Sequence, residues 1–431
     1  MQVEDSVKRV VTCCAVTAAI AAGLGARPAA AQTPSNVSAA VSPAPDAAAA
    51  PDDQTQEASR ADLIEQAQSQ KAAALAPAKR AKAEEYITRA GNAFLGGQIR
   101  WHSFFHSAYA GGGFTLGAGY TKFVSPHNTL DTRGSITFTG YKRIETEFIA
   151  PGLFDRRATL NVIGGWREAT QVGFYGFGMT STVDARANYS FQQPYGSAML
   201  ELRPTRKVFV MRGGFELTQW KQAEGSGSEP SIETKYTPEA LPGLGAQPVY
   251  FHTAAGIGID SRTAAGYTRQ GGLYAVTFHD FTDKEGVNGF QELDYEIVQH
   301  IPVLRDAWVI SLHGLLQTAY SKHDEQIPFF MMPSIGGGSD LRAYASWRLR
   351  DLNSLLLQAE WRVLANRYLD MAVFYDAGRV GPYVKSLKFD ELKNDVGLGF
   401  RFHGPAATPL RIELAKGNEG FGLVFAASQA F

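Results

Sequence analysis

The sequence predicts an all-β fold, a transmembrane antiparallel β-barrel of about 16 strands that follows a disordered or helical N-terminal tail. Three observations predict it: an export signal at the start, alternating apolar and polar residues after residue 91, and aromatic residues that bracket the apolar faces. Only 19% of the 431 residues are charged, less than the roughly 25% of an ordinary soluble domain. The 41 basic and 42 acidic residues nearly balance, so no nucleic acid is expected as a partner.

Residues 1–31 have the organisation of a signal peptide. A short basic start is followed by an apolar stretch of small residues and by a cleavage site at Ala29–Ala31. The apolar stretch is too short and too rich in alanine for a transmembrane anchor. Both cysteines of the chain, Cys13 and Cys14, lie in this segment. The mature protein is therefore expected to be exported and free of cysteine, without disulfides or thiol catalysis.

Residues 32–90 form a low-complexity periplasmic tail. Residues 32–57 are mostly Ala, Pro, Ser, Asp and Gln, and they cannot bury enough apolar surface to offset the loss of chain entropy, so we expect disorder. From residue 58 to about residue 90 the composition favours a helix that is interrupted near Pro77. This part is either an amphipathic helix that docks on a periplasmic partner or a solvated extension.

Residues 91–431 form the predicted barrel. The alternation is clearest in residues 354–363, where one face is apolar and the other carries Gln358, Glu360 and Arg362. The barrel segment has no apolar run of about 18 residues, so strands rather than helices would cross a membrane. Dividing about 330 residues by about 20 for each strand and its connection gives about 16 strands.

Alternation of this kind fits a soluble sandwich as well as a membrane barrel, and three features favour the barrel. Charged residues lie in mid-strand, opposite large apolar residues. Trp308 and Tyr320 bracket an apolar face, and a tilted strand of that length spans about 30 Å, which is membrane height. The sequence ends on a predicted strand, 421–431, with Phe431 as its final residue.

An aromatic residue at the position of Phe431, on the lipid face, is the usual insertion signal of bacterial outer-membrane barrels. We therefore expect the barrel assembly machinery to be a partner during insertion. The expected location is the outer membrane of a Gram-negative bacterium, where lipopolysaccharide and phospholipid surround the barrel.

The most informative segment is residues 327–378. It contains three consecutive glycines, then an arginine and a tyrosine, and then two carboxylates on the polar, lumen-facing side of predicted strands. These residues are Gly336, Gly337, Gly338, Arg342, Tyr344, Glu360 and Asp376, the last of which lies between Phe374 and Gly378. A loop arginine that reached both carboxylates would be held by charge-assisted hydrogen bonds. The alternative is a solvated arginine above carboxylates that line a polar channel.

The order of these motifs resembles the C-terminal barrel of the Omp85 superfamily, the BamA/TamA-type or bacterial surface antigen barrels. The resemblance implies that a Gly-Gly segment and a V/L-R-G-F/Y tetrad fold a long extracellular loop back into the barrel. In this sequence Arg342 matches the tetrad arginine, Asp376 matches its partner in the F-x-D-x-G motif, and Glu360 matches a second wall carboxylate. Residues 174–178 and 397–401 are supporting matches.

The sequence departs from the family pattern in two ways. The tetrad glycine is Ala343, which puts in doubt any need for a positive φ or a close approach there. The periplasmic POTRA domains are missing, because residues 32–90 lack the required alternation of strands and helices.

Enzyme signatures and cofactor motifs are absent, so the sequence predicts neither an enzyme nor a cofactor. His102 and His106, four residues apart on a predicted strand, are about 13 Å apart and too distant to share one metal ion. The predicted inward carboxylates Glu292, Asp294 and Glu296 form either a solvated lumen wall or a cation-selective ring. Residues 223–248 are predicted to form one long surface loop.

The resemblance implies an outer-membrane barrel that assists the insertion or translocation of proteins or lipids. In the family, the first and last strands form a weak seam that opens toward lipid. Here that seam would join a strand near residues 100–123 to the strand 421–431. The alternatives are a passive pore or structural surface antigen, and a membrane anchor whose tail, residues 32–90, recruits a periplasmic partner.

Overall fold

The computed structural model describes residues 60–74, 100–205, 208–304, 307–405 and 407–431. The predicted signal peptide and most of the predicted tail lie outside the described residues. The chain divides into two compact units, residues 1–79 and 80–431. In the first unit one helix is described, α2 (Arg60–Ala74), which ends before Pro77. None of the described helices has the length and apolar character needed to cross a membrane.

The second unit is one large antiparallel sheet of 17 strands. In chain order these are β1 (Trp101–Ser103), β2 (Thr115–Phe123), β3 (Thr129–Thr137), β4 (Lys142–Gly152), β5 (Ala158–Phe174), β6 (Ala187–Leu202), β7 (Phe209–Gln219), β8 (Lys221–Glu224), β9 (Val249–Asp260), β10 (Gly271–Asp283), β11 (Phe290–Leu304), β12 (Trp308–Ser321), β15 (Asn353–Asn366), β16 (Leu369–Gly381), β17 (Lys393–Phe402), β18 (Leu410–Gly417) and β19 (Gly420–Ala426). β7 and β8 pair with successive parts of β6, so together they occupy one strand position of the wall, which we call a stave. The sheet therefore has sixteen staves, and the predicted fold class is confirmed.

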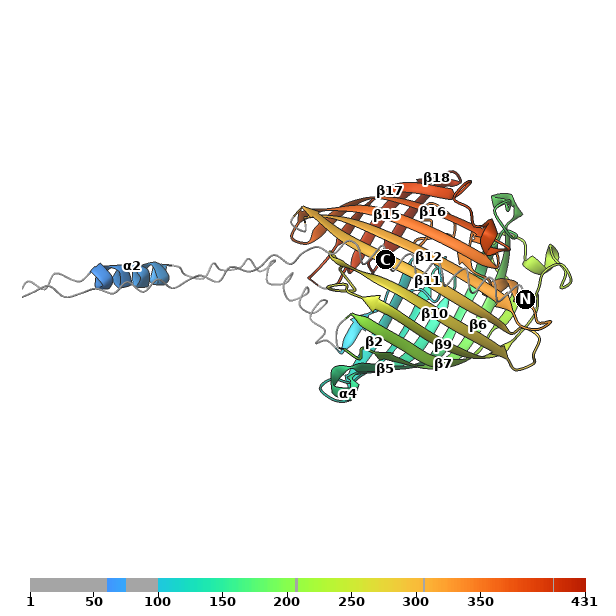
Figure 1. The fold of residues 1–431 in the computed structure, drawn as a ribbon, viewed down its shortest axis with the longest axis horizontal. Coiled ribbons are helices and arrows are strands. Elements are labelled where there is room, and N and C mark those ends of the chain that lie inside the picture. The colour runs from blue at the N-terminus through green and yellow to red at the C-terminus, as the bar shows by residue number, and fades with distance from the viewer. Residues whose placement is uncertain (1–59, 75–99, 206–207, 305–306, 406) are drawn as a thin grey trace, which may run out of the picture. The chain divides into compact units, whose positions relative to one another are not determined.

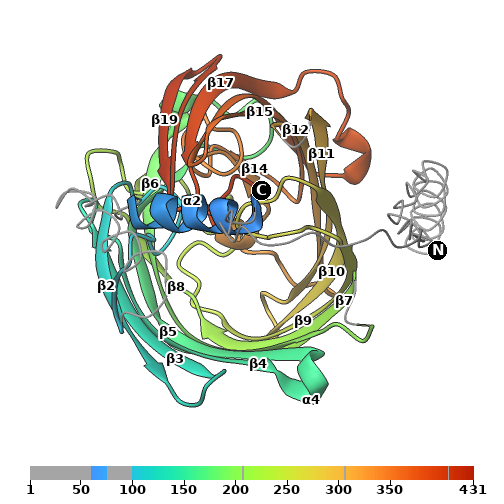
Figure 2. The same ribbon diagram turned by 90° about the vertical axis from the view of Figure 1, so that its left-hand side faces the viewer.

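Strands that follow one another in the chain pair side by side, in one series of registers from β1 to β19. Figure 1 shows the tilted strands of this wall, and Figure 2 shows them as a ring around a lumen. The two ends of this series are the β1–β2 pair and β19, and no register joins them among the described strands. These end strands are short: β1 has three residues and β19 has seven, whereas β5 has 17.

The two faces of the sheet carry the predicted alternation. In β17, Val396, Leu398 and Phe400 point outward and are exposed, whereas Asp395 and Arg401 point inward and are buried. On the outer face Trp308 packs edge-on against Trp361, with ring centroids 5.4 Å apart. Apolar side chains therefore face outward and charged side chains face the lumen, the reverse of a soluble sandwich.

The connections divide the barrel into two ends, because antiparallel strands place alternate connections at opposite rims. We name them the short-turn end and the long-loop end. Of the described residues, the short-turn end carries 124–128, 153–157, 203–205, 208, 261–270, 307, 367–368, 403–405 and 407–409. The long-loop end carries residues 138–141, 175–186, 225–248, 284–289, 322–352, 382–392 and 418–419.

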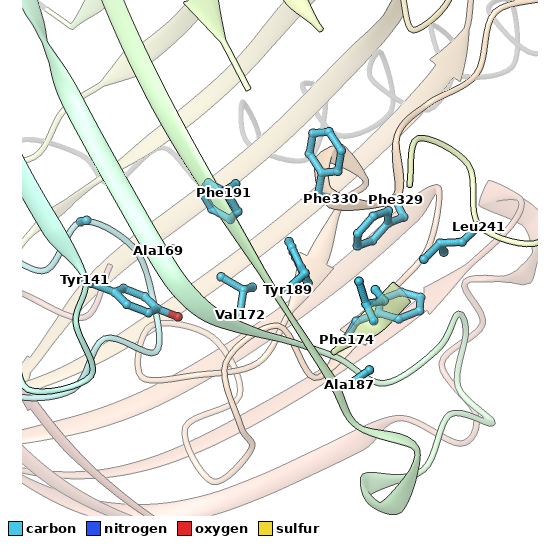
Figure 3. Close-up of a cluster of buried hydrophobic side chains, with 12 residues drawn as sticks. Tyr141, Ala169, Val172, Phe174, Ala187, Tyr189, Phe191, Leu241, Phe329 and Phe330 are labelled. Atoms are coloured by element: carbon cyan, nitrogen blue, oxygen red, sulfur yellow. The ribbon is translucent and has the colours of Figure 1, made fainter. Parts of the chain in front are cut away.

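A cluster of buried aromatic and aliphatic residues fills the lumen near the long-loop end. Phe329 and Phe330 of the loop 322–352 pack against Tyr189 and Phe174 of the wall (Figure 3). Leu241, from the connection between β8 and β9, is fully buried in the same cluster. Most of residues 223–248 are exposed or half-buried, as predicted for a surface loop. The prediction is wrong at Ile232 and Leu241, whose side chains are buried, and at residues 223–224, which belong to β8.

Both ends of the barrel sequence differ from expectation. The final strand stops at Ala426, and the Phe431 ring lies near His313 and His300, which belong to the inner face of β11 and β12. Phe431 is therefore not on the lipid face. At the other end β1 stops at Ser103, so His106 is not on a strand. His102 contacts Asp131 at 2.7 Å, and the His106 ring lies 5.4 Å from the Phe104 ring.

A charged residue on the outer face of the sheet should strongly destabilise the barrel. Leu398 is 61% exposed in the middle of β17, so Leu398→Arg should lower the free energy of unfolding by roughly 2–4 kcal/mol when the surrounding medium is hydrocarbon. The matched control is Phe389→Arg in the loop 382–392, where Phe389 is 76% exposed, and a change within about 0.5 kcal/mol is expected. Urea unfolding from lipid vesicles measures both, and equal losses would contradict a lipid-facing β17.

Candidate functional site

The candidate site forms where the loop 322–352 turns back into the lumen. Within the loop, β13 (Ser334–Ile335) pairs with β14 (Leu349–Arg350), and the segment between them folds inward. Gly336 and Gly337 have φ of 127° and 111°, which side-chain-bearing residues rarely adopt. A Cβ on Gly336 would lie 2.5 Å from the carbonyl oxygen of Ala345. These glycines therefore permit the tight turn, whereas Gly338 has an ordinary φ and packs against Val424 of β19.

Arg342 is the centre of the site, and its side chain is fully buried. Its Nε and Nη2 lie 2.9 Å and 3.1 Å from the two carboxylate oxygens of Asp376. Its Nη1 donates to Glu413 at 2.7 Å and lies 3.5 Å from Glu360. The structure thus brings together the three residues that the sequence singled out, Arg342, Asp376 and Glu360, and it adds Glu413 as a closer partner than Glu360.

The environment of Arg342 keeps it charged. Burial disfavours the guanidinium ion, but the carboxylates of Asp376, Glu413 and Glu360 outweigh burial and raise the pKa of Arg342 above its usual value. The guanidinium also lies over the Phe374 ring, with Cζ 3.7 Å from the ring centroid. Gly397 makes room for that ring, because a Cβ there would lie 2.2 Å from Phe374 Cζ.

Neighbouring contacts hold the loop on both sides of Arg342. After Arg342, the backbone N–H of Ala343 donates to Asp395 at 2.9 Å, and the Tyr344 hydroxyl donates to the carbonyl of Asn394 at 3.0 Å.

Before Arg342, the loop is held by Gln358, whose Nε2 donates to the carbonyl of Asp340 at 2.9 Å. Gly378 lies close to Ile335 of the loop, since a Cβ on Gly378 would be 2.6 Å from Ile335 Cδ1. The wall therefore binds the backbone of the loop as well as the side chain of Arg342.

Ala343, where the family has glycine, is accommodated by glycines of the wall. Ala343 itself keeps an ordinary negative φ. A Cβ on Gly417 would lie 3.1 Å from the Ala343 Cβ, and a Cβ on Gly422 would lie 2.1 Å from the carbonyl oxygen of Arg342. The close approach expected of the loop is thus provided by β18 and β19, and the loop backbone lies directly against the end strand β19.

The sequence did not predict that three further residues would join the ion pairs around Arg342: Glu413, Arg401 and Arg411. Arg401 bonds to both Glu360 and Glu413, and Arg411 lies 3.4 Å from Glu413. Together with Arg342, Arg362, Glu360, Asp376 and Asp395, these three residues form a buried set of four arginines and four carboxylates. The available signal was the inward parity of Arg411 and Glu413 on β18, which are two residues apart on one face. Nothing in that pattern showed that they would meet Arg342.

Several other polar groups of the wall contact one another. Among the described residues no group of three or more His, Cys, Asp or Glu side chains is arranged to hold a metal ion. Glu292 and Asp294 accept from Gln317 at 3.2 Å and 3.4 Å, and Glu296 lies 3.5 Å from His313. His300 Nδ1 lies 2.8 Å from the hydroxyl of Ser311, but both residues are buried and Ser311 is also bound by Arg362.

Fold and site together define a class of protein: a transmembrane antiparallel β-barrel whose own loop enters the lumen and is held there by a buried arginine. No protein-family model matches the sequence, and no curated protein matches it. Among solved structures, the barrel is similar to BamA from Haemophilus ducreyi lacking POTRA domains 1–3. That match has a TM-score of 0.56 and 15% identity, and it covers 76% of this chain and 68% of that one.

Two further structures, CdiB from Acinetobacter baumannii and CdiB from Escherichia coli, match at TM-scores of 0.48 and 0.49 and 11% identity. They cover 72% and 77% of this chain, which spans 56% and 60% of theirs. The similarity to the BamA barrel shows the fold: this chain forms a β-barrel similar to that of BamA.

Removing the buried guanidinium should strongly destabilise the barrel. Arg342→Met leaves Asp376 buried without its arginine and removes one of the three arginines around Glu413, which costs about 3–5 kcal/mol in a dry site. The control is Arg379→Gln, because Arg379 pairs with the exposed residues Asp390 and Glu391 and should lose less than about 1 kcal/mol. Equilibrium unfolding in vesicles compares the two variants, and a similar small loss in both would mean that the lumen around Arg342 is wet.

A methyl group on β19 should displace the loop. In Gly422→Ala the new Cβ meets the backbone of Arg342 and Ala343, and such overpacking costs about 1–3 kcal/mol. The control is Gly196→Ala, where a Cβ meets no atom within 4 Å. Limited proteolysis of the folded barrel should cut within residues 322–352 faster in Gly422→Ala than in the control. Identical cleavage rates would show that the loop does not need close contact with β19.

Proposed function

We propose that this chain is an outer-membrane barrel of the Omp85 type that assists the insertion or translocation of proteins or lipids. The observation that carries the proposal is the contact between the inward loop and the end strand. The backbone of Arg342 and Ala343 lies against Gly422 of β19, and Gly338 lies against Val424. A loop seated on the last strand of the series is in a position to influence how that strand meets β1 and β2.

The short end strands support the same role. The series ends at β1, with three residues, and at β19, with seven, so only a short hydrogen-bonded ladder could form between its two ends. In β2, Gly117 approaches the backbone of Gly134 and Phe104 closely and provides no side chain for packing. A closure of this kind costs less to open than a junction such as that between β5 and β6, which are 17 and 16 residues long.

The filled lumen favours this proposal over a passive pore. The loop 322–352 enters from the long-loop end, and the aromatic cluster around Phe329 occupies the same end. A large steady conductance requires an open water-filled path, and these segments narrow the lumen. The third possibility, a membrane anchor with a recruiting tail, gains no specific support from α2, because its large apolar residues, Leu63 and Ile64, are adjacent and form no stripe.

The proposal includes a location and partners. The barrel would lie in the outer membrane of a Gram-negative bacterium, with its long-loop end outside the cell and its short-turn end in the periplasm. Phospholipid and lipopolysaccharide would surround it, and the barrel assembly machinery would insert it. Residues 32–90 would be available to a periplasmic partner. Since the predicted insertion signal Phe431 lies on the lumen side, it would be read before the barrel closes.

A vesicle experiment tests the function. The purified chain in phospholipid vesicles should increase the rate of lipid scrambling, or the rate at which an unfolded outer-membrane barrel inserts, relative to protein-free vesicles. Arg342→Met should change that rate by releasing the loop from β19, and Arg379→Gln should not.

The same vesicles also report on the pore alternative. Mostly closed, flickering conductance agrees with a plugged barrel. A large steady current with neither scrambling nor insertion would contradict the proposal and favour a passive pore.

A further inference from the structure

Residues 427–431, which follow β19, lie on the inner wall of the barrel. The side-chain oxygen of Gln429 accepts a hydrogen bond from the backbone N–H of Thr268 at 2.7 Å. The Phe431 ring lies nearly parallel to the imidazoles of His313 and His300, at centroid distances of 5.1 Å and 6.2 Å. The segment thus makes one directed polar contact and one aromatic contact, two residues apart.

The residues that receive the segment are fixed by the wall. Thr268, in the loop 261–270, is fully buried, and its carbonyl accepts from Arg362 Nη2 at 2.5 Å. The same Nη2 donates to Ser311 at 2.9 Å, and the Ser311 hydroxyl bonds to His300 at 2.8 Å. One guanidinium therefore contacts the carbonyl of Thr268 and, through Ser311, also holds one of the two imidazoles.

The second imidazole, that of His313, is held by the side chain of Gln358. His313 Nδ1 lies 2.8 Å from the side-chain oxygen of Gln358, whose nitrogen donates to the loop carbonyl of Asp340. An oriented donor next to two held aromatic rings is a preorganised receptor, since little conformational freedom is lost when a ligand binds.

We propose that Thr268, His300 and His313 form a peptide-binding site on the lumen wall. Its ligand is an extended segment with an amide side chain and an aromatic side chain two residues further on, and residues 427–431 are its resident occupant. The amide oxygen satisfies the buried N–H of Thr268, which would otherwise be unpaired, and the aromatic ring covers the imidazoles. A peptide of the same chemistry competes with the resident segment for this place.

The site also forms part of a cover at the short-turn end. In the loop that carries Thr268, the Tyr267 ring stacks on His403 at 3.9 Å, and its hydroxyl donates to Asp370 at 3.0 Å. The carbonyl of Gly266 accepts from Thr408 at 3.1 Å. The loop 261–270, the loop 403–409 and the segment 427–431 therefore meet at the short-turn end of the lumen. Releasing the segment removes one of the three parts of this cover.

Peptide binding in trans tests the proposal. In a full-length variant, residues 427–431 are replaced by glycine and serine, and a fluorescent peptide with the sequence of residues 426–431 is added. Fluorescence anisotropy should show saturable binding to this variant. Binding should weaken about tenfold when alanine replaces the glutamine of the peptide, because the Thr268 N–H then remains unpaired.

Two controls locate the peptide. His313→Ala in the variant should weaken binding, whereas His127→Ala, in an exposed turn at the same end, should not. The unaltered chain should bind poorly because its own segment occupies the site. Equal binding by the unaltered chain, by His313→Ala, or by a peptide with alanine in place of phenylalanine would overturn the proposal.

A second experiment keeps both contacting residues of the segment, Gln429 and Phe431, and does not depend on folding of the replacement variant. Cysteines at Thr268 and Ala430 should be joined rapidly by a short bifunctional thiol reagent, because the adjacent Gln429 contacts Thr268. The matched pair places cysteines at His127 and Ala430 and should react far more slowly. Absence of crosslinking at Thr268 in folded protein would show that the segment does not occupy the site.

Discussion

The structure depends on one constraint, which is that the buried guanidinium of Arg342 must remain paired. A charge removed from water is tolerated only when opposite charges and hydrogen bonds replace the lost hydration. Asp376, Glu413 and Glu360 provide that replacement from three different strands. The pairing therefore determines where the loop 322–352 lies and aligns β15, β16 and β18 around one point. Gly417 and Gly422 are consequences of the same constraint, because they let the loop come close enough.

The lumen is occupied from both ends, and the two occupants share a network. Glu360 lies 3.5 Å from Arg342 at the loop and 3.6 Å from Arg362, which holds Thr268 of the short-turn end. A rearrangement of either occupant changes the partners of the same buried charges. Functions that need a permanently open lumen fit poorly with this arrangement. Functions in which the wall and its plug rearrange together fit well, and this is the physical basis of the proposed role.

Much of the barrel was predictable because alternation depends on local sequence only. The two faces of β17 follow from Val396, Leu398 and Phe400 against Asp395 and Arg401, and no knowledge of neighbouring strands is needed. The loop arginine and the carboxylates Asp376 and Glu360 were also identified, because they stand in a resembling order along the chain. Glu413 was missed although it lies closer to Arg342 than Glu360 does. Its partner is 71 residues away, and parity shows which face a residue occupies but not what it meets there.

The amino-acid sequence alone determined the strand periodicity, the approximate number of staves and the inward position of the charged residues, since these follow from residue type and spacing. The tertiary structure decided which inward charges meet, that Gly417 and Gly422 accommodate Ala343, and that the residues after β19 turn into the lumen. Those outcomes depend on register and on the curvature of the closed ring, which bring distant strands to common points. Phe431 shows the difference most clearly. Its place in the sequence predicted a side chain that faces lipid, whereas in the structure its ring lies near His300 and His313, inside the barrel.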